Sequence, residues 1–310
     1  MIEIVRPGPL ATVQDLGRPG YAHLGVGRSG AADRDSLRLA NRLVGNPETA
    51  AGLEITFGGL TATFTRQSLI ALTGAPTPAH LLPRAPAGPG GTGALGPSGA
   101  GGIAPGRAGG IGARGVGLNG PVAVGAGDVL VLGAPERGVR TYLAVRGGID
   151  VPAVFGSRAT DLLGGLGPPA LGPGTRLPIG TGAGPFPAVD VAPVARPGLT
   201  LTARPGPRAD WFVPEALNAV NGPYTVTAES NRVGLRLDGP PLRHREQREL
   251  PTEGLAEGSL QVPPSGRPIL MLADHPVTGG YPVIAVLDQA ALGAAAQARP
   301  GDRIRFVIGS

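Results

Sequence analysis

The sequence predicts an all-β fold, mainly β with short helices, built from two similar β units. Its 310 residues include 54 glycines and 35 prolines but only 16% charged residues. Glycine and proline break helix interiors and favour tight turns, so this composition indicates many short strands rather than a helical bundle. Segments of the first half also recur in the same order in the second half, which indicates an internal duplication.

Strands are predicted at 1–5, 199–203 and 303–308, because apolar and polar residues alternate in these three segments. The opening IEIVRPGP reappears as LTLTARPGP and places Arg6 opposite Arg204. The other matching pairs are 37–39 with 235–237, 69–72 with 269–272, and 127–133 with 301–309. We therefore expect one unit at 1–190 and a second at 198–310. The proline-rich stretch at 173–197 is the predicted linker.

The clearest predicted helix runs from about residue 33 to residue 44. Its apolar positions, spaced to share one face, are Leu37, Ala40 and Val44. Ser29 or Asp33 can cap its start, and Gly45 followed by Pro47 ends it. By contrast, the Gly-, Ala- and Pro-rich tract at 84–114 cannot bury enough apolar surface to offset its ordering entropy, so it is predicted to be an insertion in the first unit.

Two residue types are missing, and their absence excludes whole classes of chemistry. Cysteine does not occur, which removes thiol nucleophiles, disulfides and thiolate metal sites. All 27 basic residues are arginine. Without lysine the chain cannot carry biotin, form a phosphate-binding P-loop or make a Schiff base. Such functions have to come from a partner.

The net charge and the hydropathy of the sequence limit the kinds of binding partner that we expect. The formal net charge is +5, but the arginines are scattered and few aromatic residues accompany them, so no nucleic-acid binding is expected. No signal sequence or membrane-spanning apolar stretch is recognisable, and we expect a cytoplasmic protein with no membrane partner. The four histidines lie far apart, which predicts no metal site.

The first group of candidate site residues lies in a turn-rich stretch before the predicted helix. It consists of Gln14, Asp15, Arg18, Ser29 and Asp33. Side chains of both charge signs could orient a polar amide or carboxylate, and the planar guanidinium suits a carboxylate well. Alternatively, Asp15 caps a turn and pairs with Arg18 on the surface. Gly25, Gly27 and Gly30 have the spacing of a dinucleotide-binding pattern. The residues before them do not form the strand that this pattern needs, so a turn or an anion-binding helix end is favoured.

Two further groups lie in the second half. Glu229, Asn231 and Arg232 precede an apolar alternation, where a ligand site and a plain polar turn are both compatible with the pattern. A loop after the apolar run at 269–273 offers Thr278, Gly279, Gly280 and Tyr281. Its two glycines permit close backbone approach to a ligand, although a simple hairpin has the same pattern. His275, beside this loop, is assigned no role.

Several motifs together resemble one known family. They include TVQDLGR at 12–18, GVGRSGAAD at 25–33, LEIT at 53–56, ESNRVGLRL at 229–237 and DHPVTGGYPVIAV at 274–286. Their order and spacing are similar to the allophanate hydrolase subunit 2, or biotin-dependent carboxyltransferase-like, family, over nearly the whole chain. The resemblance implies cyclophilin-like β-barrel units. It also implies catalytic roles for Asp15, Arg18, Asp33, Glu229 and Arg232, and substrate binding by the other candidates.

Family members include the C subunit of 5-oxoprolinase and KipA-like proteins, so the resemblance implies one component of a heteromeric, ATP-dependent amide-processing enzyme. In that case ATP, with Mg at the level of the complex, drives 5-oxoproline to glutamate, and the partners are the KipI-like B subunit of 5-oxoprolinase together with its A subunit. Arginines would stabilise phosphate or carboxylate charge, and carboxylates would move protons. One alternative is carboxyl transfer to urea or a similar amide from biotin on a separate carrier. Another is a non-catalytic, KipA-like antagonist of a kinase inhibitor.

Overall fold

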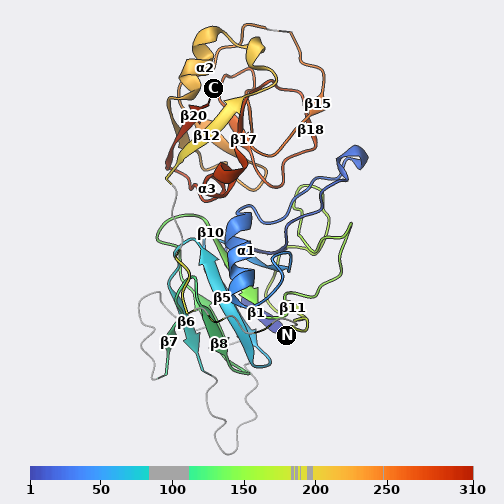
Figure 1. The fold of residues 1–310 in the computed structure, drawn as a ribbon, viewed down its shortest axis with the longest axis vertical. Helices are drawn as coiled ribbons and strands as arrows, with labels where there is room; N and C mark the ends of the chain where they lie inside the picture. The colour runs from blue at the N-terminus through green and yellow to red at the C-terminus, as the bar shows by residue number, and fades with distance from the viewer. Residues whose placement is uncertain are drawn as a thin grey trace, which may run out of the picture.

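The computed structural model describes residues 1–83, 112–182, 185, 188, 190–193, 198–246 and 248–309. Strands dominate and the few helices are short, which confirms the predicted all-β class (Figure 1). The predicted insertion at 84–114 lies outside the described residues as far as residue 111, as does part of the predicted linker. We call residues 1–190 the first unit and residues 198–310 the second unit.

The strands of the first unit form two antiparallel sheets. The six-stranded sheet has the order β11 (Arg176–Leu177), β1 (Ile2–Arg6), β4 (Thr61–Phe64), β9 (Val129–Leu132), β6 (Ala79–Leu82) and β7 (Arg114–Gly115). The five-stranded sheet has the order β2 (Leu10–Gln14), β3 (Gly52–Thr56), β10 (Arg140–Val145), β5 (Ser68–Gly74) and β8 (Pro121–Val124). Apolar residues of both sheets share one buried cluster, so the sheets enclose a common core.

The second unit contains a closed barrel of seven strands. Their order is β12 (Thr200–Pro205), β19 (Val283–Leu287), β16 (Ser259–Gln261), β17 (Ile269–Met271), β14 (Gly234–Asp238), β13 (Pro223–Val226) and β20 (Arg303–Ile308). A parallel pair, β12 with β20, closes the barrel, and alternate residues of both strands point into the core. Two short strands, β15 (Glu253–Gly254) and β18 (Thr278–Gly279), pair outside it.

The longest helix among the described residues is α1 (Arg34–Leu43), and it forms where the sequence predicts it. Asp33 caps its start, because the Asp33 carboxylate accepts a hydrogen bond from the Ser36 backbone N–H at 3.1 Å. Two shorter α-helices, α2 (Pro214–Val220) and α3 (Leu292–Ala296), belong to the second unit. Single 3₁₀ turns occupy Ala22–Leu24, Ala209–Trp211 and Gln289–Ala291. None of these helices is long and apolar enough to cross a membrane.

Two sequence predictions differ from the structure in detail. The predicted linker starts too early, because β11 pairs with β1 and therefore belongs to the first sheet. In the predicted repeat, 37–39 lies in α1 whereas its counterpart 235–237 lies in β14. Both segments read Leu-Arg-Leu. A three-residue apolar-polar-apolar pattern is too short to distinguish the period of a helix from the period of a strand, so this one match in the predicted repeat was a coincidence.

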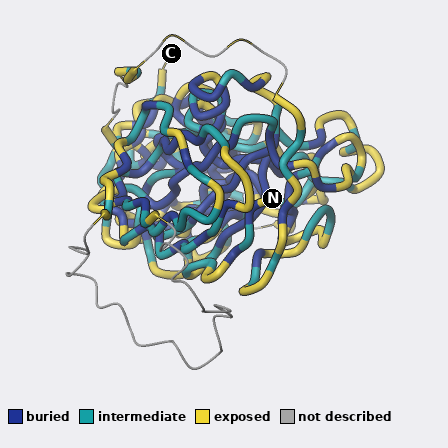
Figure 2. Tube along the Cα trace, turned by 90° about the horizontal axis from the view of Figure 1, so that it is seen from below, coloured by how far each residue is buried: buried dark blue, intermediate teal, exposed yellow. Residues whose placement is uncertain are grey.

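The two units stack along the long axis, with α1 and α3 at the boundary between them (Figure 1). Buried residues fill the interior and exposed residues the surrounding loops (Figure 2). Three small residues, Ala32, Ala273 and Ala296, form a buried cluster at this boundary. Small side chains let the two backbones approach closely, so neighbouring polar groups of both units come within reach of each other.

Candidate functional site

The most deeply buried ionic cluster joins the two units through Arg232. Its Nε and Nη2 donate to the two carboxylate oxygens of Asp274 at 2.8 and 2.9 Å, and Nη1 donates to Glu54 of β3. Nη2 also donates to the Gly30 carbonyl at 2.7 Å. The three charged side chains are at most 3% exposed. Burial alone would lower the pKa of Arg232, but the two carboxylates raise it above its usual value.

Glu54 holds its charge through a complete set of donors. Its Oε2 accepts from the Ala32 backbone N–H at 3.0 Å and from the Tyr142 hydroxyl at 2.7 Å, while Arg140 Nε lies 3.4 Å from Oε1. Burial opposes the charged form, but Arg232 and Arg140 outweigh it and hold the pKa of Glu54 below its ordinary value. Burial, and then Glu54, raise the pKa of Tyr142 well above 10. The Glu54 carboxylate therefore accepts its hydrogen bonds from protein groups, whereas Arg140 Nε has no hydrogen-bond partner among the described residues.

Ser29 belongs to the same buried network. Its hydroxyl donates to Asp274 Oδ1 at 2.6 Å and lies 3.2 Å from the Thr160 carbonyl. The residue has a φ of 51°, a left-handed conformation that non-glycine residues rarely adopt. Sequence reasoning proposed Ser29 as a substrate-binding residue, and the structure places it beneath the cleft surface, where it connects the two units.

Asp33 is also committed to structure. Besides capping α1, its Oδ2 accepts from the Ser36 hydroxyl at 2.7 Å and from the Gln297 amide of the second unit at 2.9 Å. The Gln297 carbonyl in turn accepts from the backbone N–H groups of Val139 and Arg140 at 3.0 and 2.9 Å. Gln297 thus extends from the end of α3 and fastens the two units together beside Asp33.

Asp33 should make the unfolding free energy depend on pH. Burial raises the pKa of Asp33 above its ordinary 3.8, partly opposed by hydrogen bonds from Gln297 and Ser36. A raised folded-state pKa means that the folded protein retains the proton more tightly, so the unfolding free energy falls as pH rises from about 4 through the folded pKa. Asp33→Asn does not titrate and still caps a helix. In urea denaturation we expect wild type to lose stability relative to Asp33→Asn over this range; a pH-independent difference would contradict the argument.

Arg18 is fully buried, although sequence reasoning left open a surface pair with Asp15. Its Nη2 donates to the Ala159 carbonyl and its Nε to the Val154 carbonyl at 3.4 Å. Nη1 lies 3.7 Å from Asp161 Oδ2 and has no hydrogen-bond partner among the described residues. Arg18 therefore retains one buried donor that the described protein groups do not satisfy.

Asp15 and Gln14 form hydrogen bonds that hold the segments around Arg18 in place. Asp15 Oδ1 accepts from the Gly17 backbone N–H at 2.8 Å and from the Ser157 hydroxyl at 2.6 Å, as a turn-capping carboxylate does. Oδ2 accepts from the Arg158 backbone N–H at 2.6 Å. The Gln14 amide donates to the Thr160 carbonyl at 2.9 Å. Asp15 thus takes the capping role that the sequence allowed as an alternative.

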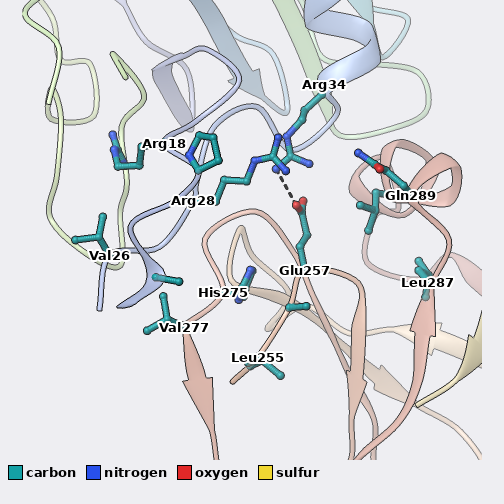
Figure 3. A pocket seen from close by; sticks show the side chains of 15 residues that line it. Arg18, Val26, Arg28, Arg34, Leu255, Glu257, His275, Val277, Leu287 and Gln289 are labelled. Carbon is teal, nitrogen blue, oxygen red and sulfur yellow. Dashed lines mark hydrogen bonds and ion pairs between the residues drawn. The ribbon is translucent and has the colours of Figure 1, made fainter. Parts of the chain in front are cut away.

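A cleft of about 350 Å³ opens at the boundary between the units, next to the buried cluster (Figure 3). Its polar lining is mainly basic and consists of Arg18, Arg28, Arg34, Glu257, His275 and Gln289. Apolar walls come from Val26, Leu255, Val277, Leu287 and Leu292. Arg34, at the start of α1, pairs with Glu257 of the second unit at 2.7 Å. The cleft thus combines three guanidinium groups with a single carboxylate that is already paired.

None of the remaining candidates lines this cleft. The side chain of Glu229 is 80% exposed, with Arg236 at 3.9 Å as its ion-pair neighbour, so the polar turn that was the alternative interpretation applies here. Asn231 is exposed and accepts the Val233 backbone N–H at 2.8 Å. Thr278, Gly279, Gly280 and Tyr281 lie on or beside the outer strand β18, and Tyr281 is 45% exposed. The catalytic role for Glu229 therefore has no geometric support.

Sequence reasoning missed five residues that define the site. They are Glu54, Asp274, Arg28, Arg34 and Glu257. Glu54, Asp274 and Arg28 lie inside motifs that carried the family resemblance. They were missed because candidate site residues were chosen only where several polar residues cluster in the sequence. A signal existed for Glu54, since a lone carboxylate in the apolar strand LEIT needs a buried partner.

The fold and site define a two-unit β protein with an arginine-lined cleft between the units, and solved structures share its fold. The family "carboxyltransferase domain, subdomain A and B" matches residues 24–89 and 106–308. The match is interrupted at 90–105, inside the tract predicted to be an insertion.

Individual relatives match over nearly the whole chain. The C subunit of 5-oxoprolinase from Escherichia coli (strain K12) is 38% identical, covering 99% of this chain and 91% of that protein. The urea amidolyase of Lachancea kluyveri is 32% identical, covering 98% of this chain but 17% of that enzyme. The crystal structure of TTHA0988 has a TM-score of 0.81 at 33% identity, covering 99% of this chain and 55% of that chain. This chain therefore belongs to the carboxyltransferase domain family, which confirms the resemblance drawn from its motifs.

Proposed function

We propose that the chain is one component of a heteromeric, ATP-dependent enzyme that opens 5-oxoproline to glutamate. The observation that carries this proposal is the arginine-lined cleft between the units, in a chain similar over nearly its full length to the C subunit of a 5-oxoprolinase. Three guanidinium groups in a small cleft suit a small anionic substrate. The amide-processing names of both kinds of relative support the coarser class of reaction.

The residues of the cleft would bind and orient the substrate. Arg28 and Arg34 would neutralise its charge, and Arg18 would donate to an oxygen atom through Nη1, which has no hydrogen-bond partner among the described residues. A lactam is a poor electrophile, and coupling to ATP supplies a better leaving group at its oxygen. The donor set fits carboxylate or phosphate oxygens. It does not fit a magnesium ion, because Glu257, the one carboxylate among the described residues that line the cleft, is paired with Arg34.

Exposed apolar residues near the cleft support assembly with further proteins of a complex. Two loops of the first unit lie side by side, with the rings of Tyr21 and Phe155 5.0 Å apart. Leu24, Phe155, Leu162 and Leu163, all in these loops, are between 41% and 60% exposed. Large apolar side chains gathered on a surface are typical of protein contacts. We propose relatives of the B and A subunits of 5-oxoprolinase, the former KipI-like, as the partners, with cytoplasmic localisation.

Co-purification with these partners tests the proposal. We expect the assembled complex to hydrolyse ATP faster with 5-oxoproline than without it, and to release glutamate in equal amount. The chain alone and the partners alone serve as controls. A stable complex whose ATP hydrolysis ignores 5-oxoproline would refute the assignment.

Carboxyl transfer to urea or a similar amide is a second candidate, favoured by the similarity to urea amidolyase. Since the chain has no lysine, biotin would have to arrive on a separate carrier protein. Transfer of labelled carboxylate from a biotinylated carrier to urea in the presence of this chain would support that reaction, and its absence would argue against it.

A further inference from the structure

Arg28 has no partner of its own among the described residues, which distinguishes it from the other two arginines of the cleft. Arg18 lies near Asp161 and Arg34 pairs with Glu257. Within the described ranges, the Arg28 guanidinium makes no hydrogen bond and no ion pair, and its buried Nε has no acceptor. Figure 3 shows its side chain extending into the cleft toward Arg34 and Glu257.

The electrostatic environment of Arg28 is unfavourable without an anion. Burial, and then the neighbouring charge of Arg34, lower the pKa of Arg28, and Glu257 only partly offsets them because it is bound to Arg34. A buried charged donor without an acceptor costs free energy that a bound anion would recover. A carboxylate matches the Arg28 guanidinium, because its two oxygens can accept from two neighbouring N–H groups of the planar fork.

From these contacts we infer that Arg28 binds the carboxylate of the substrate and selects small amides that carry a carboxylate over neutral amides such as urea. This inference rests on the proposed function for the choice of 5-oxoproline as ligand. Apolar walls formed by Leu255, Val277 and Leu292 line the same cleft and suit the hydrocarbon part of a small ring. A neutral amide would leave the Arg28 charge unpaired.

Titration calorimetry on the full chain tests the inference with a matched pair of ligands. 5-Oxoproline and 5-oxoprolinamide have nearly the same shape but differ by one charge. We expect wild type to bind the acid about 10- to 100-fold more tightly than the amide, which is the range for a hydrogen bond to a charged group. Arg28→Gln should weaken acid binding by a similar factor and leave amide binding unchanged. Arg28→Lys should be intermediate, because it keeps the charge but loses the fork.

The matched control is Arg176→Gln. Arg176 lies on β11 and forms an exposed ion pair with Glu3 of β1, so the substitution removes the same charge away from the cleft. Arg176→Gln should bind both ligands as wild type does. Equal binding of acid and amide by wild type would overturn the inference, and so would unchanged acid binding in Arg28→Gln with its melting temperature preserved. Inorganic phosphate binding more tightly than the acid would overturn the assignment to a carboxylate.

A second carboxylate separates failure of the inference from failure of the proposed function. If glutarate binds in an Arg28-dependent manner and 5-oxoproline does not, the carboxylate site stands and the 5-oxoprolinase assignment fails. If neither carboxylate binds, the inference is wrong, whatever the activity of the complex.

Discussion

Replacing Arg232 with methionine should destabilise the protein by about 3–5 kcal/mol, because it leaves the buried Asp274 carboxylate without its counter-charge and the buried Glu54 carboxylate with only the longer contact to Arg140. Glu54 and Asp274 come from different units, and both depend on this guanidinium at the boundary. The loss should therefore separate the units as well as weaken each fold. Urea denaturation measures the free energy, and limited proteolysis between the units reports their separation.

The control for this substitution lies four residues away. Arg236→Met removes a half-exposed guanidinium whose nearest carboxylate, Glu229, is 3.9 Å away, so its effect should stay below about 1 kcal/mol. Adding Asp274→Asn to Arg232→Met should recover part of the loss, since Asp274 then carries no buried charge and Glu54 keeps its ion pair with Arg140. A cost for Arg232→Met no larger than that for Arg236→Met would show that the buried cluster does not hold the units together.

The sequence predicted those helices and strands whose ends are set by interactions between residues close together in the chain. Helix α1 has its cap, its apolar face and its glycine stop within about twelve residues, so both of its ends are predictable without tertiary contacts. The terminal strands β1 and β20 were likewise predicted from alternation. The linker boundary was not, because β11 is two residues long and forms only by pairing with β1. Pairing partners so far apart in sequence leave no local pattern.

The site could be predicted only in part, for the same reason. Arg232 and Glu54 are 178 positions apart and meet only after both units have folded. Glu229 and Arg232 look equivalent in the sequence, yet one is 80% exposed and the other 3%. Burial therefore decided which polar residues belong to the boundary, and burial follows only from how the two folded units pack against each other. The motifs located the region, and the contacts assigned the individual roles.

Gly17→Ala should disrupt the cleft and cost about 3 kcal/mol or more, because it forces a side chain against backbone atoms. Gly17 has a φ of +82°, and an added Cβ would lie 2.5 Å from the carbonyl oxygens of both Arg28 and Ser29. The Arg28 carbonyl also accepts the Arg18 backbone N–H at 2.8 Å, so the two segments cannot separate without losing this bond. This contact brings Arg18 and Arg28 into one cleft. Urea denaturation and calorimetric 5-oxoproline binding should both report the loss.

Gly25→Ala isolates the conformational part of that cost. Gly25 has a similar φ of +76°, but no atom lies within 4 Å of its added Cβ. Its expected cost is about 1–2 kcal/mol, the ordinary penalty for a left-handed non-glycine residue. The excess of Gly17→Ala over Gly25→Ala then measures the clash between the two segments. Equal costs would mean that the segments move apart freely, and in that case Gly17 would not be what positions Arg28 beside Arg18.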